Sequence, residues 1–112
     1  MIGPIVTVTV ERPLGSYHPE HPDMYYPVNY GCIKGTMAAD GEEEDAYILG
    51  VDKPVPEFTG RIIARIDRED DTEFKWVIAP EGAHFTEKEI AELTCFQEQY
   101  FVSTVTLLQE IE

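Results

Sequence analysis

The stretch that decides the fold is YPVNYGCIKGTMAADGEEEDAYILGV, residues 26–51. Its first part, 26–33, is an extended run whose alternate members are Tyr, Val, Tyr and Cys, which is typical of a strand with one buried side. Gly35 then turns the chain, and five carboxylates occupy the six positions 40–45. Residues 46–51 are mostly apolar again. The stretch therefore predicts two strands joined by an acidic loop.

Further strands are predicted on both sides of this stretch. Residues 5–11, IVTVTVE, alternate valine with threonine, the period-two pattern of a half-buried strand. Residues 61–66 and 73–79 alternate in the same way around an acidic turn, so we expect them to pair as a hairpin. The tail STVTLLQEI, residues 103–111, predicts a sixth strand, which we expect to pair with the first.

One helix is predicted after Thr86. Thr86 and Glu89 have the spacing of a capping box, and Phe85 and Ile90 have that of a hydrophobic staple. The side chains expected to face the sheet are Ile90, Leu93, Phe96, Gln97 and Tyr100. Six short strands and one helix in the C-terminal half predict a mainly β fold, α+β by content: a small closed or partly open antiparallel barrel.

Length and charge limit the classes of function. A chain of 112 residues suits one domain, so we expect residues 1–112 to form a single unit. A formal net charge of −14 repels nucleic-acid phosphates and anionic lipid, so we expect neither nucleic acid nor membrane as a partner. We find no signal peptide or membrane-spanning run and expect a cytoplasmic location. Cys32 and Cys95 lie outside any CxxC motif and are expected to be reduced.

The acidic loop predicts a cation site. Neighbouring carboxylates repel by roughly 1 to 4 kcal/mol per pair, and a bound divalent ion removes that penalty. Oxygen ligands favour Mg²⁺, Mn²⁺ or Ca²⁺. An EF-hand is excluded, because the sixth position counted from Asp40 is Asp45 where that loop needs glycine. A solvated acidic turn is the alternative.

The same stretch resembles the signature region of the soluble, family I inorganic pyrophosphatases. In that family a Tyr-Pro-x-Asn-Tyr-Gly-Tyr-Ile strand precedes an Asp-Gly-Asp-Pro-x-Asp loop at the same spacing. The matching residues here are Tyr26, Pro27, Asn29, Tyr30, Gly31, Ile33, Asp40, Gly41 and Asp45. The segments DREDDTEFKWVIAP and CFQEQYF resemble two later family segments, so the resemblance covers about residues 24–101.

The resemblance implies an OB-like barrel that hydrolyses pyrophosphate, a phosphoanhydride, to two phosphates with Mg²⁺, or Mn²⁺, as cofactor. It implies metal ligands at Asp40, Asp45 and Glu73, catalytic carboxylates at Glu42 and Asp45, and phosphate contacts at Tyr30, Lys75 and Tyr100. Because relatives of this type commonly assemble, a homo-oligomer is also allowed.

The chain also departs from the family pattern. Positions 42 and 73 carry Glu where the family has Asp, and Phe101 stands where the family has a phosphate-binding Lys. In this chain we find no counterpart of the family's longer N-terminal segment, so we expect a short variant with a truncated N-terminal segment. Arg12 could replace one phosphate contact, because its guanidinium group fits phosphate oxygens, or it could be an exposed residue at a strand end.

Three functions stay open from the sequence. The first is pyrophosphate hydrolysis by a metal-activated water. The second is a catalytically silent relative that binds a metal or a phosphorylated ligand, and the third is a hydrolase of another phosphoanhydride. His18 and His21 could approach phosphate or metal from their proline-rich loop, or be exposed bystanders.

Overall fold

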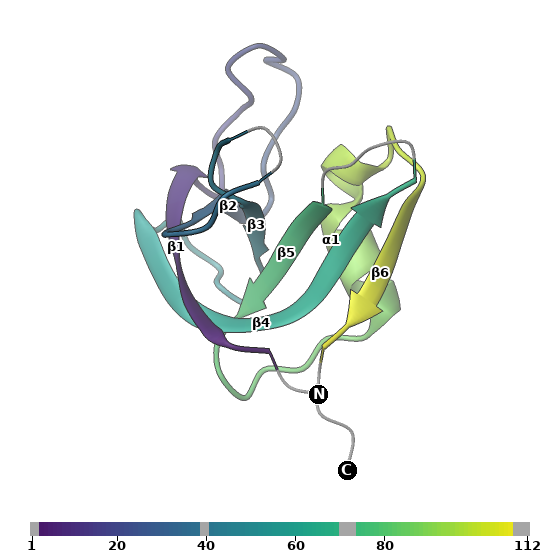
Figure 1. The fold of residues 1–112 in the computed structure, drawn as a ribbon. Helices are drawn as coiled ribbons and strands as arrows, with labels where there is room; N and C mark the ends of the chain where they lie inside the picture. The colour runs from purple at the N-terminus through teal and green to yellow at the C-terminus, as the bar shows by residue number, and fades with distance from the viewer. Residues whose placement is uncertain (1–2, 39–40, 70–73, 109–112) are drawn as a thin grey trace.

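A computed structural model describes residues 3–38, 41–69 and 74–108 of the chain. Its elements are, in chain order, β1 (Ile5–Arg12), β2 (Asn29–Ile33), β3 (Asp45–Ile48), β4 (Glu57–Arg68), β5 (Phe74–Ala79), α1 (Glu87–Glu98) and β6 (Ser103–Leu107) (Figure 1). Each expected strand and the expected helix are present, with bounds that differ by a few residues.

Five of the strands close into a barrel in the order β1-β2-β3-β5-β4, because β1 pairs with β4 as well as with β2. The strand β4 is 12 residues long, which is enough for two different strands to pair side by side along one of its edges. Its first half, from Glu57 to Arg61, pairs with β1, and its second half, from Ala64 to Arg68, pairs with β6. The expected pairing of the sixth strand with the first was wrong. Both edges of β1 are already taken by β2 and β4.

The expected barrel is confirmed, but it is mixed rather than fully antiparallel. The strands β3 and β5 run parallel, with Ala46 opposite Trp76 and Ile48 opposite Ile78. The predicted hairpin of β4 and β5 is confirmed as an antiparallel pair. Because parallel neighbours begin at the same edge of a sheet, the start of β3 at Asp45 lies beside the start of β5.

The core forms on both faces of the central strands. All five barrel strands contribute to one buried cluster, which fills the barrel interior: Val8, Ile33, Ala46, Ile48, Ile62 and Ile78. A second cluster lies between the barrel wall and α1, where Ile90 packs with Tyr47 and Val77. Figure 1 shows α1 against the outside of the barrel, beside β4, β5 and β6. The apolar runs of β3 and β5 are therefore explained by burial on both faces.

The predicted helix start is confirmed at Thr86. Its hydroxyl accepts from the Glu89 amide at 3.1 Å, and the Glu89 carboxylate accepts from the Thr86 amide at 2.8 Å, which completes the capping box. The buried side of α1 consists of Ile90, Thr94 and Glu98. Leu93 is 37% exposed and Tyr100 lies beyond the helix, so neither packs as predicted. In the described part of the chain, no helix has the length and apolar character needed to cross a membrane.

Candidate functional site

A pocket of about 590 Å³ opens between the loop that joins β1 to β2 and the C-terminal end of α1. Its lining comes from three parts of the chain: His18, His21, Asp23, Met24 and Tyr25 from the loop, Arg68 and Lys75 from the barrel, and Phe96, Gln97, Gln99, Tyr100 and Phe101 from the helix end. Two predicted site residues, Lys75 and Tyr100, thus share one cavity.

The predicted residues Asp45 and Lys75 lie in contact. The Lys75 ammonium nitrogen is 2.6 Å from Oδ2 of Asp45, because the parallel register of β3 and β5 sets these positions side by side. The Lys75 side chain is 4% exposed and that of Asp45 is 34% exposed. A buried ammonium needs a counter-ion, and Asp45 provides one while keeping part of its carboxylate toward solvent.

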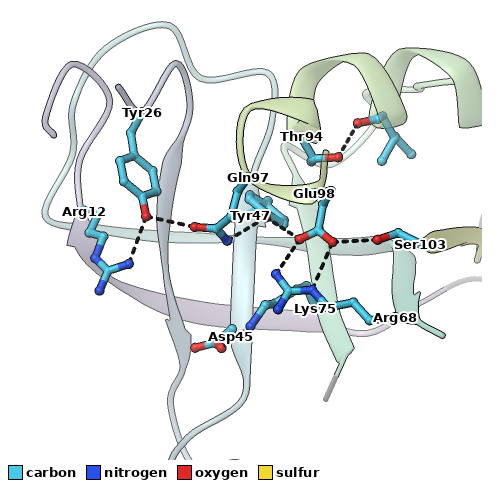
Figure 2. Close-up of polar contacts among 11 residues, drawn as sticks. Arg12, Tyr26, Asp45, Tyr47, Arg68, Lys75, Thr94, Gln97, Glu98 and Ser103 are labelled. Atoms are coloured by element: carbon cyan, nitrogen blue, oxygen red, sulfur yellow. Dashed lines mark hydrogen bonds and ion pairs between the residues drawn. The ribbon is translucent and has the colours of Figure 1, made fainter. Parts of the chain in front are cut away.

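A buried ion pair fixes the end of α1 on the barrel. Glu98 accepts from Arg68 Nε at 3.1 Å and Nη2 at 2.9 Å, from the Tyr47 hydroxyl at 2.6 Å and from Ser103 Oγ at 2.8 Å (Figure 2). Burial opposes ionisation of Glu98, but these hydrogen bonds outweigh it and hold the Glu98 pKa below its ordinary value. Burial likewise disfavours the Arg68 cation, yet its bonds and attraction to Glu98 leave the Arg68 pKa raised.

A chain of hydrogen bonds joins Arg12 to this pair. Arg12 Nη1 donates to the Tyr26 hydroxyl at 2.9 Å, which donates to Gln97 Oε1 at 2.9 Å. Gln97 Nε2 donates in turn to the Tyr47 hydroxyl at 2.8 Å, and Tyr47 donates to Glu98. Figure 2 shows these side chains in one line from β1 to the helix. Arg12 is therefore oriented by the network rather than free at a strand end.

Tyr30 packs in the core instead of lining the pocket. It is 6% exposed, and its ring contacts those of Tyr26 and Tyr47 at centroid distances of 5.8 and 5.0 Å. Burial, followed by the negative charge of Asp45, raises the pKa of Tyr30 far above its ordinary value. Its hydroxyl therefore stays protonated and can only act as a neutral hydrogen-bonding group.

The acidic loop is partly tied to the barrel. Glu43 accepts from Cys32 Sγ at 3.3 Å and from the Gly35 amide at 3.0 Å, and Glu44 accepts from Trp76 Nε1 at 2.8 Å. These two acids therefore have protein donors, which the sequence did not predict.

The predicted metal ligands are only partly described. Asp40 and Glu73 lie outside the described residues, and Glu42 is exposed on its loop. Within residues 3–38, 41–69 and 74–108, no three His, Cys, Asp or Glu side chains converge as a metal-binding group. Asp45 fits a hard divalent ion as a single, partly exposed oxygen donor, with Oδ2 shared with Lys75.

Sequence reasoning missed two charged residues of this site. Arg68 stands in an acidic run that reads as a solvated turn, and Glu98 was not included in the apolar stripe of the helix. A local signal existed for Glu98, because Ile90, Thr94 and Glu98 recur every four residues and so share one helix face.

Comparison with known proteins points to one family. The family model for inorganic pyrophosphatase matches residues 9–105. An inorganic pyrophosphatase of Caulobacter vibrioides is 44% identical over 43 residues, which are 38% of this chain and only 23% of that relative's length. The crystal structure of the Ehrlichia chaffeensis inorganic pyrophosphatase matches with a TM-score of 0.71 at 20% identity, covering 93% of this chain and 86% of that one. The Helicobacter pylori inorganic pyrophosphatase gives a TM-score of 0.63 at 18% identity, covering 92% and 82%. At these identities the structural matches show the fold.

Proposed function

This chain belongs to the inorganic pyrophosphatase family, and on that premise we propose that it hydrolyses pyrophosphate to two phosphates in the pocket beside α1. The observation that carries the proposal is the contact of Asp45 with Lys75 at 2.6 Å. It sets a carboxylate that can hold a divalent cation next to an ammonium group that lines the pocket and can hold a phosphate oxygen.

Cationic and anionic residues of the site would have different roles, the former binding phosphate and the latter binding the metal ion. Lys75, Arg68 and Tyr100 line the pocket and would contact phosphate oxygens. Asp45, together with Asp40 and Glu73, would hold Mg²⁺ or Mn²⁺. When bound, such ions lower the pKa of an attacking water and neutralise the phosphoryl oxygens. A protein with a net charge of −14 needs this compensation to accept an anion.

The reaction itself is a displacement at phosphorus. The oxygen of a water molecule bonds to one phosphorus, and the bridging P–O bond breaks. The bridging oxygen leaves with the second phosphate and keeps the electron pair of the broken bond. Glu42, on the neighbouring loop, would accept the proton of the water. The rest of the site would orient the anhydride, and the hydrogen bond to Tyr26, itself bonded to Gln97, holds the Arg12 guanidinium group in one position.

A phosphate-release assay tests this proposal, with Mg²⁺ and separately with Mn²⁺. We expect metal-dependent turnover by the parent and a loss of about 100-fold or more in Asp45→Asn, because that substitution removes a charged ligand. Asp52→Asn is the matched control, since Asp52 is exposed and lies away from the pocket lining. No turnover with either ion would refute the proposal, provided that circular dichroism shows the parent to be folded.

A second candidate is a relative that binds a phosphorylated ligand without turning it over. It is favoured by the pairing of the two barrel cations that line the pocket, Lys75 with Asp45 and Arg68 with Glu98, which reduces the positive charge offered to a reacting phosphate. Calorimetry with Mg-pyrophosphate separates the two functions. Tight binding without phosphate release supports the second candidate, and absence of binding eliminates it.

A further inference from the structure

The outer part of the pocket is aromatic, which pyrophosphate alone does not explain. Tyr25 is 45% exposed, Tyr100 68% and Phe101 43%, and all three line the cavity. Pyrophosphate has no apolar surface with which to cover these rings. Exposed aromatic groups gathered around a cavity mark a place where a ligand buries apolar surface. The cavity volume of about 590 Å³ also suits a ligand larger than a bare diphosphate.

Two of these rings are held in place before any ligand binds. The Tyr25 ring meets Tyr17 edge-on with centroids 5.5 Å apart, and the backbones of these two residues form an isolated bridge. Phe101 lies under the Arg68 guanidinium group at 3.7 Å, and its amide donates to the Glu98 carbonyl at 3.0 Å. Fixed rings lose little conformational freedom when a flat ligand stacks on them.

A neutral polar group also lines the pocket. Nδ1 of His18 accepts from the Glu20 amide at 3.0 Å, so a neutral imidazole carries its proton on Nε2. Burial and the nearby Arg12 and His21 lower the pKa of His18, which favours that neutral form. The ring is therefore suited to donate to a hydroxyl group of a ligand.

Taken together, these features lead us to propose that the pocket prefers a nucleoside diphosphate over pyrophosphate. The two phosphates lie toward Arg68 and Lys75, the sugar near His18, and the base among the aromatic rings. Flat rings interleaved with polar groups fit a planar base better than a flexible hydrocarbon chain.

Hydrolysis of the nucleoside diphosphate rests on the proposed function, but its binding does not. In turnover, water oxygen bonds to the terminal phosphorus, the bridging P–O bond breaks, and the nucleoside monophosphate leaves with the bridging oxygen.

The test combines calorimetry with phosphate release, using Mg-ADP, Mg-pyrophosphate and geranyl diphosphate as probes. We expect ADP to bind roughly tenfold tighter than pyrophosphate, as one stacked base allows. Tyr25→Ser should reduce that preference roughly tenfold. Val102→Ser should leave it unchanged, because Val102 is 63% exposed next to Phe101 but does not line the pocket.

The outcomes separate this inference from the proposed function. The inference is overturned if ADP binds no tighter than pyrophosphate, if Tyr25→Ser leaves the preference intact, or if geranyl diphosphate binds best. Pyrophosphate hydrolysis without any preference for ADP would leave the proposed function standing and remove the inference. Tight ADP binding without phosphate release from either anhydride would leave the inference standing and remove the proposed function.

Discussion

Replacing Glu98 by glutamine tests whether the buried ion pair holds α1 to the barrel. Glu98 accepts two hydrogen bonds from Arg68, one from Tyr47 and one from Ser103. Glutamine has nearly the same shape, but one acceptor oxygen becomes an NH₂ donor among other donors. Both side chains of the pair are 7% exposed, so water cannot replace the lost charge beside Arg68.

The expected loss in the free energy of unfolding is about 3 to 5 kcal/mol, the usual cost of removing one partner from a buried pair. With a urea dependence of about 2 kcal/mol per molar, the midpoint of urea unfolding should fall by about 2 M. Glu81→Gln is the matched control. Glu81 pairs with Arg61 but its side chain is 70% exposed, so its substitution should cost less than about 1 kcal/mol.

Urea unfolding followed by circular dichroism provides the measurement, with Arg68→Met and the double variant completing a cycle. We expect the double variant to be about 2 kcal/mol more stable than the sum of the single effects predicts, because no unpaired charge remains. The reasoning is refuted if Glu98→Gln costs no more than Glu81→Gln, or if the two single effects simply add.

Four further predictions follow from local contacts. Thr86→Ala should lower the free energy of unfolding by about 1 kcal/mol by removing the cap, whereas Thr86→Ser should not; equal losses in urea unfolding would contradict this. Gly31→Ala should give little folded protein, because the added Cβ would lie 1.9 Å from a backbone carbonyl oxygen of β1; a melting temperature equal to that of the parent would refute it. Because the Glu98 pKa is depressed in the folded protein, the Glu98 carboxylate stabilises the fold above the ordinary value of 4.5, and this stabilisation is lost as pH falls through the lower folded value. The urea midpoint should therefore fall more steeply with acid in the parent than in Glu98→Gln. Parallel plots of urea midpoint against pH for the two proteins would contradict this. Burial and a hydrogen bond to a carboxylate raise the pKa of Cys32 to about 12, so iodoacetamide at pH 8 should label Cys95 first; mass spectrometry showing Cys32 modified first would overturn this.

The features predicted correctly from the sequence are mostly local ones. The start of α1 depends on residues three positions apart, and both partners of the capping box are visible in the sequence. The β4–β5 hairpin likewise joins neighbouring runs. The partner of β6 was predicted wrongly, because strand pairing depends on which edges the rest of the barrel leaves open. The parallel pairing of β3 with β5 was missed for the same reason.

Among the residues of the candidate site, some were also predicted from the sequence and others were missed. Asp45 and Lys75 were both named from the sequence, and the structure brings them into contact. Arg68 and Glu98 were missed because each looks like a solvated charge until its partner, 30 positions away in the chain, is known. A charged side chain is buried here only because its partner of opposite charge is buried with it, so the hydrophobicity pattern around either residue alone could not reveal the ion pair.

The shared strand β4 sets the order in which this barrel can be completed. Its first half provides the second neighbour of β1, and its second half provides the neighbour of β6. During synthesis on the ribosome, β1 and β2 emerge early, but the ring cannot close until β4 and then β5 have followed them, because β5 lies between β3 and β4 in the sheet. Nascent chains that stall before β4 would expose the edge of β1 to other polypeptides, and chaperone contacts should concentrate on this interval.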